Sequence, residues 1–204
     1  MSTVVQSSPP STRYRLDHLG WDDKRGTGGM ICTIATEASL FIMLFFSYFF
    51  LAKDSWLWPH EQPPKLPLAL TMLAILLASS VVLSWGERQL KQHQFGRARL
   101  SILITIGLGV VFLAVQVLEY KDHLKTLTPR TNAYGSIFYT ITSFHAAHVI
   151  GGLIILAYVA ALPHLEPVDR PPYRPFRNAA LYWHFVDAVW VCVVALLYVA
   201  PNLR

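Results

Sequence analysis

A small set of side chains that could do chemistry lies inside long apolar runs of this sequence. They are one carboxylate near the start of the chain and three pairs, each spaced three residues apart: Glu37, Gln116 with Glu119, His145 with His148, and His184 with Asp187. Residues three apart on a helix share a face, so each pair could act together. Ionisable groups inside a membrane are costly and usually face other protein or a cavity. The pattern indicates either a functional site or a hydrogen-bonded contact between helices.

A metal site is one function that these side chains could serve, because histidine and carboxylate are both metal-ligand types. A di-iron helix bundle needs a Glu-x-x-His pair on each of two helices. In this sequence the acidic residue of the last pair follows its histidine, within "YWHFVDAVW", so that motif is absent. We therefore expect no metal site. Haem ligation by one histidine from "SFHAAHVIGG" and one from "YWHFVD" is an alternative that the sequence leaves open.

Glu37 raises a third possibility, a path for protons or for a substrate. It is the carboxylate placed most deeply in the first apolar run, within "ATEASLFIMLFFSYFF". The alternative is a carboxyl group that takes part only in a local hydrogen-bond network. The residues alone do not decide between these two roles.

The simplest interpretation of the remaining polar groups is a structural polar seam that holds the helices together, with no catalytic residue in the chain. Its members would be Gln116, Glu119, His145, His148, Trp183, His184, Asp187 and Trp190. Trp183 and Trp190 are seven residues apart and fall on one helical stripe. Gly151 and Gly152 follow the histidine pair and would let a neighbouring helix approach closely.

Five long apolar runs supply the elements that position these residues. We expect an all-α membrane bundle, one domain over residues 27–204, with five transmembrane helices at 27–52, 66–90, 100–124, 136–162 and 178–199. About 20 mostly apolar residues cross a bilayer as a helix, and the runs lack the alternation of barrel strands. The chain is 53% hydrophobic and 14% charged, whereas soluble domains are about 25% charged.

The polar segment at residues 1–26 is expected to be a flexible cytoplasmic arm. It is not a secretory signal peptide, because no apolar core precedes a small-residue cleavage site. Cys32 and Cys192 both lie within apolar runs. We therefore expect two buried, unpaired thiols rather than a disulfide framework.

Basic residues in the connections indicate which way the helices face. The arm, the second loop and the fourth loop carry four, four and three Lys and Arg residues, whereas the opposite side carries two, three and one. Because basic residues in short loops tend to stay cytoplasmic, we expect the N-terminus inside and the C-terminus outside. This topology accounts for the net charge of +5, and nothing in the sequence indicates nucleic-acid binding.

Several motifs resemble one family. "YGSIFYTITSFHAAHVIGG" followed by "LYWHFVDAVWVCVVALLYV" closely resembles subunit III of the haem–copper terminal oxidases. The third run adds "LAVQVLEY", which is similar to the family's Gln-x-x-Glu-Tyr segment, and Glu37 before an aromatic-rich run looks like its membrane-embedded glutamate. The resemblance spans residues 29–199, and the motifs occur in the family's order.

The resemblance implies an accessory subunit of a bacterial respiratory cytochrome c oxidase, in its five-helix form. Such a subunit lies in the bacterial cytoplasmic membrane and supports electron transport and proton pumping without a redox centre of its own. Haem and copper would belong to the partners, with oxidase subunit I as the main contact and subunit II and others in the complex. Bound phospholipid is also implied. Glu37 would be the family's carbodiimide-reactive glutamate, connected with lipid or proton uptake, and the polar seam would be structural.

The sequence departs from the longest family members, which have seven helices, because two N-terminal helices are missing. One wall of the family's lipid cleft would then come from another subunit or be absent. A quinol oxidase subunit or a relative linked to nitric oxide reductase is an alternative, although "LEY" followed by "YGS" looks nearer to the cytochrome c branch. An independent small transporter or proton channel is a further alternative, although no internal repeat typical of transporters is visible in the sequence.

Overall fold

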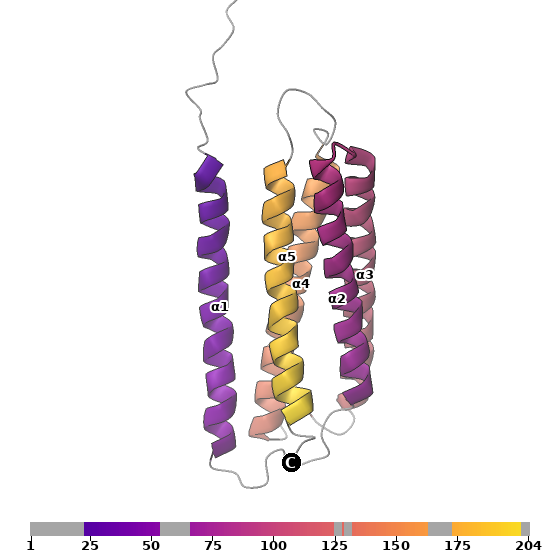
Figure 1. Cartoon of the computed structure of the whole chain (residues 1–204). Helices are drawn as coiled ribbons and strands as arrows, with labels where there is room; N and C mark the ends of the chain where they lie inside the picture. Colours follow the sequence, from indigo (N-terminus) through magenta and orange to yellow (C-terminus); the bar gives the residue numbers. More distant parts are fainter. Residues whose placement is uncertain (1–22, 54–65, 125–127, 129–131, 163–172, 201–204) are drawn as a thin grey trace, which may run out of the picture.

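The computed structural model describes residues 23–53, 66–124, 128, 132–162 and 173–200, and its regular elements are all helical (Figure 1). The long helices are α1 (Asp23–Lys53), α2 (Leu66–Lys91), α3 (Phe95–His123), α4 (Ala133–Ala161) and α5 (Tyr173–Val193). α5 continues directly into a π-helical segment, η3 (Val194–Val199). Within the described ranges, 5 helices are long and apolar enough to cross a membrane. The predicted all-α bundle with five spans is confirmed.

α3 and α5 extend furthest beyond the predicted apolar runs, in each case at the polar N-terminal end. α3 begins at Phe95 rather than at residue 100, and α5 begins at Tyr173 rather than at residue 178. Hydropathy marks the part of a helix that suits lipid, whereas the helix itself can continue into the polar layer. Pro175 fits the first turn of α5, where its missing N–H breaks no helical hydrogen bond. Most of the arm predicted at residues 1–26 lies outside the described residues.

α2 and α3 pack closely on small side chains. A Cβ atom added to Gly86 of α2 would overlap the side chain of Ser101 of α3. Nearby, the Thr105 hydroxyl of α3 donates to the Ser79 carbonyl of α2 at 3.4 Å. The short turn between the two helices includes His93 in the left-handed region, with φ 58°. Small residues let transmembrane helices approach in this way.

α5 is the most enclosed of the helices, and its two inward tryptophans, Trp183 and Trp190, are fully buried. Glycines on two neighbouring helices make room for Trp183. A Cβ on Gly109 of α3 would lie 2.8 Å from its ring, and a Cβ on Gly152 of α4 would lie 2.9 Å from it. The expectation of a close helix approach is confirmed at Gly152. At Gly151 the nearest atom would be 3.5 Å away, which is ordinary contact.

α1 stands at one edge of the bundle and packs mainly against α4 and α5 (Figure 1). Phe41 and Tyr48 on its inner face are buried. Its outer face exposes large apolar side chains, including Ile42, Met43, Phe46, Phe49 and Phe50. A large exposed apolar surface suits lipid or a protein partner rather than water.

The prediction of two buried cysteines is wrong in one respect. Cys32 of α1 and Cys192 of α5 are free thiols, but both are exposed on the bundle surface. Lipid tails are as apolar as a protein core. A residue in an apolar transmembrane run can therefore face either one, and hydrophobicity alone does not reveal burial.

Candidate functional site

The polar residues singled out in the apolar runs lie in three clusters. The first joins α1 to α4 and contains Glu37 and His148. The second joins α2 to α5 and contains His184 and Asp187. The third lies between α3, α4 and α5, around His145, Trp190, Gln116 and Glu119. The first two clusters join helices that are not consecutive in the chain, and the third joins three consecutive ones.

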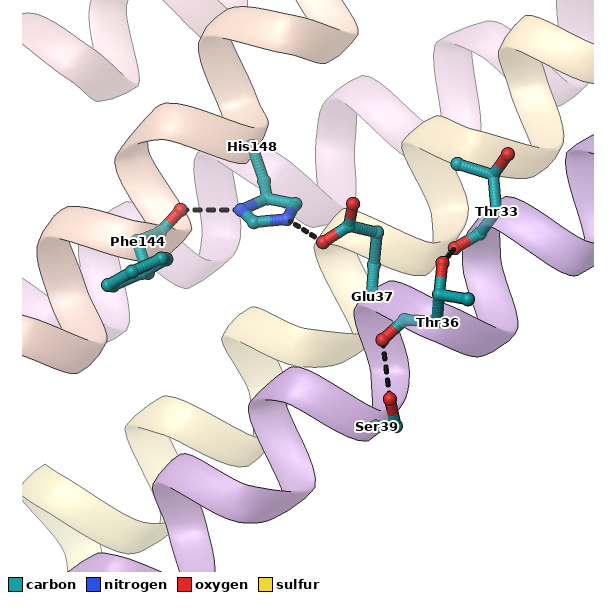
Figure 2. Close-up of polar contacts among 6 residues, drawn as sticks. All are labelled: Thr33, Thr36, Glu37, Ser39, Phe144 and His148. Atoms are coloured by element: carbon teal, nitrogen blue, oxygen red, sulfur yellow. Dashed lines mark hydrogen bonds and ion pairs between the residues drawn. The ribbon is translucent and has the colours of Figure 1, made fainter.

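The first cluster is a direct contact between two ionisable side chains, shown in Figure 2. The Nε2 atom of His148 lies 2.8 Å from Oε2 of Glu37, and its Nδ1 atom lies 2.6 Å from the Phe144 carbonyl oxygen. Phe41 packs against the imidazole with its ring centroid 4.9 Å away. The Glu37 side chain is 34% exposed and that of His148 is 12% exposed. The carboxyl group therefore sits at the surface of the bundle, held by a more enclosed histidine.

These distances fix where protons must lie. A carbonyl oxygen accepts only, so Nδ1 of His148 carries a hydrogen. The contact with Glu37 then needs one more proton, either on Nε2 as an ion pair or on the carboxyl group as a neutral pair. By contrast, Thr33, Thr36 and Ser39 donate to carbonyls of their own helix, as Figure 2 shows for the last two. Glu37 is therefore the polar group through which this part of α1 contacts α4.

The second cluster is built around the Ser80 hydroxyl of α2. Its oxygen lies 2.8 Å from Nδ1 of His184 and also contacts Oδ2 of Asp187. Ser84, one turn further along α2, lies 3.4 Å from Nε2 of the same imidazole. Beside this group, the Trp183 indole N–H donates to the Ser79 hydroxyl at 2.9 Å. The same-face pair predicted from the sequence is thus connected through α2.

The serines of this second cluster are functional neighbours that sequence reasoning missed. Ser79, Ser80 and Ser84 lie in "LLASSVVLSW", and a serine in a helix can satisfy its hydroxyl on its own backbone, so its presence alone does not indicate a contact with another helix. The available signal was their spacing. Ser80 and Ser84 are four apart and share a face. A hydroxyl stripe on an apolar helix is suited to pairing with polar residues elsewhere in a bundle.

The third cluster is centred on stacked rings. His145 and Trp190 stack with centroids 4.7 Å apart and 27° between their planes, and Phe112 meets both edge-on at 5.7 and 5.0 Å. His145 is fully buried. Within the described ranges, the two ring nitrogens of His145 have no hydrogen-bond partner. The same is true of the Trp190 indole N–H. Ring contacts therefore hold this residue pair in place.

Glu119 and Tyr198 close the other end of the third cluster. Tyr198 donates to Oε1 of Glu119 at 3.0 Å, and both residues are buried, as is Gln116 one turn earlier on α3. Tyr198 lies on η3, eight residues after Trp190. In a regular α-helix these two would be rotated about 80° apart. The wider π turn reduces that rotation, so Tyr198 stays near the face that carries Trp190.

The described residues do not form a complete ligand set. No group of three His, Cys, Asp or Glu in the described ranges is placed to hold a metal ion. The three histidines of α4 and α5 face different neighbours: His148 contacts Glu37, His145 contacts Trp190, and His184 contacts Ser80.

Comparison with known proteins gives one consistent result. Residues 23–201 match the sequence model of the family described as Cytochrome c oxidase subunit III. The chain is 33% identical to cytochrome c oxidase subunit 3 of Synechocystis sp., over 97% of this chain and 87% of that protein. It is 34% identical to the same subunit of Danio rerio and 33% identical to that of Artemia franciscana, in each case over 83% of this chain and 67% of the relative. This multi-pass membrane chain therefore belongs to the cytochrome c oxidase subunit III family.

Proposed function

We propose that this chain is the accessory subunit III of a bacterial respiratory cytochrome c oxidase, in the bacterial cytoplasmic membrane. The observation that carries the proposal is the family match over residues 23–201, which includes all five helices. The Synechocystis relative supports a bacterial setting, since it aligns with 97% of the chain. The complex would reduce oxygen to water and pump protons, with haem and copper in subunits I and II.

The chain's own role in this complex would be to support the catalytic subunit rather than to carry electrons. The arrangement of histidines and carboxylates supports this, because the described residues divide into three clusters without a shared ligand set. The exposed apolar side of α1 offers a surface for phospholipid or for subunit I. Glu37, half-buried near the middle of that helix, would take part in lipid contact or proton uptake while His148 holds its carboxyl group.

The proposed orientation places the N-terminus in the cytoplasm. The α2–α3 turn and the N-terminal end of α5 would then also be cytoplasmic, because the chain crosses the membrane between successive turns. The excess of Lys and Arg in the arm, the second loop and the fourth loop supports this arrangement.

Purification of the tagged chain from its native membrane in mild detergent tests the proposed function. We expect oxidase subunits I and II to co-purify in equal amounts, with the haem and copper absorption of a terminal oxidase. A copper-binding motif in the companion subunit II would distinguish a cytochrome c oxidase from a quinol oxidase. Recovery of the chain without oxidase subunits, or haem bound stoichiometrically to the chain alone, would overturn the proposal.

A further inference from the structure

Polar side chains line one side of the contact between α2 and α5, from the middle of the bundle toward the Lys91 end of α2. Asp187 is buried, whereas Ser80, Ser84 and His184 are half-buried. Glu87 follows Ser84 by three residues and Ser80 by seven, so it lies on the same face of α2. Glu87 pairs with Lys91 at 3.2 Å. The line of polar groups thus begins at charged residues near the end of α2 and ends at an enclosed carboxyl group.

The Ser80 hydroxyl has one hydrogen but two polar neighbours. When Asp187 is a carboxylate, Ser80 donates to it and must accept from the Nδ1–H of His184. When Asp187 is protonated, its O–H can donate to Ser80, which then donates to an unprotonated Nδ1. Both arrangements satisfy every contact with the same heavy-atom positions. They differ only in where the hydrogens lie.

The second ring nitrogen of His184, Nε2, also differs between the two arrangements. In the first arrangement Nε2 of the neutral ring has a lone pair and accepts from Ser84, 3.4 Å away. In the second arrangement Nε2 carries the hydrogen and donates to Ser84. The second state therefore holds one more proton than the first. The added proton enters at Nε2, on the Ser84 side of the ring. The shift of hydrogens along the chain of contacts then leaves a new O–H bond on Asp187.

The surroundings of Asp187 favour the protonated arrangement. Its Oδ1 atom is buried and has no hydrogen-bond partner within the described residues. An ionised carboxylate is costly in an apolar interior unless it is paired and hydrogen-bonded. The other titratable groups on elements packed nearby engage different partners: Glu37 with His148, His145 with Trp190, and Glu119 with Tyr198.

We propose that Ser84, His184, Ser80 and Asp187 form a proton-binding site inside the bundle, supplied from the Lys91 end of α2. In the binding step Ser84 gives its hydrogen to Nε2 of His184 as it receives the external proton, which comes from a hydronium ion either directly or by way of the Glu87 carboxylate. His184 passes its Nδ1 hydrogen to Ser80, and Ser80 passes its own hydrogen to Asp187. One external proton is taken up and one carboxyl O–H bond is formed. The proposal does not depend on the chain's place in an oxidase.

Infrared spectroscopy of the full chain in lipid nanodiscs tests the site directly. We expect a band of a protonated carboxyl group that disappears in Asp187→Asn. On transfer to heavy water this band should shift as the hydrogen exchanges. Ser80→Ala and Ser84→Ala should each slow that exchange on the order of a hundredfold, the lower end of what a positioned proton donor contributes.

Ser39→Ala is the matched control, because that hydroxyl is exposed on α1, outside the α2–α5 contact, and donates to a carbonyl of its own helix. Its exchange rate should equal that of the wild type. Circular dichroism checks that each variant is folded. If Ser80→Ala does not fold, the test rests on Ser84→Ala, which leaves the Ser80 contacts intact. The proposal is overturned if no carboxyl band depends on Asp187, or if Ser84→Ala exchanges as fast as Ser39→Ala.

Discussion

The contact between Glu37 and His148 is a residue-scale feature whose consequences can be measured. Glu37→Gln keeps the contact, because the new amide N–H can donate to Nε2 of His148 while Nδ1 continues to donate to the Phe144 carbonyl. Glu37→Ala leaves Nε2 of the largely enclosed His148 without this partner, and the loss of an intramolecular hydrogen bond typically costs about 0.5–1.5 kcal/mol. We expect the glutamine variant to assemble with largely intact peak oxidase activity, and the alanine variant to unfold at a lower temperature.

Thermal unfolding of the purified complex and its oxidase spectrum provide the measurements for this pair of variants. Ser39→Ala on the same helix is again the control, since its hydroxyl makes only a local bond. Loss of the whole oxidase spectrum in Glu37→Gln would show that the carboxyl group itself, rather than a hydrogen bond at this position, is needed for assembly.

At this scale the sequence identified the polar residues within the membrane but not their partners. His184 and Asp187 share a face and do meet the same serine. His145 and His148 have the same spacing, yet they contact different helices. An offset of three residues rotates a side chain by about 60°. In a bundle of several helices that rotation is enough to change the neighbour, and only the packing decides which neighbour it is.

At the scale of the helix, glycines let neighbouring helices approach closely. Gly107 and Gly109 of α3 form a matched pair for testing this effect. A Cβ on Gly109 would lie 2.8 Å from the Trp183 ring, whereas a Cβ on Gly107 would meet nothing within 4 Å. Overpacking a filled core costs about 1–3 kcal/mol, and Ala exceeds Gly in helix propensity by up to about 1 kcal/mol. Gly109→Ala should therefore lower the unfolding temperature, and Gly107→Ala should leave it unchanged or raise it. Equal unfolding temperatures for the two variants would contradict the close packing of Trp183 and Leu153 against Gly109.

Helix number and position followed from hydropathy because each span needs about 20 apolar residues. Hydropathy could not place α1 beside α4 and α5 and away from α3, since every helix has apolar surface on several sides. It also could not reveal η3, because a π turn leaves the composition of the helix unchanged. The prediction that Cys32 and Cys192 are buried was wrong for the same physical reason, since both are exposed on apolar helix surfaces. The sequence therefore predicts elements well and their neighbours poorly.

Across the whole molecule, α1 lies at one edge, α2 and α3 lie toward the other, and α5 connects the two sides (Figure 1). The two proposals lie on different sides of the bundle, because Glu37 of α1 contacts His148 of α4, whereas the serines of the proton-binding site join α2 to α5. The direction of proton supply depends on which end of the bundle faces the cytoplasm. If the Lys91 end of α2 is cytoplasmic, the site on Asp187 takes its protons from the side where a proton-pumping oxidase takes up its own.

Orientation can be tested with single cysteines in a background that carries Cys32→Ser and Cys192→Ser, since both native thiols are exposed. Gln92 lies in the α2–α3 turn, Lys53 ends α1 on the opposite side, and both are exposed. Because basic loops stay cytoplasmic, we expect Gln92→Cys to react with a membrane-impermeant maleimide only in inverted vesicles. Lys53→Cys should react only in right-side-out vesicles. The reverse pattern would place the Lys91 end outside, and protons would then reach Asp187 from the opposite side of the membrane.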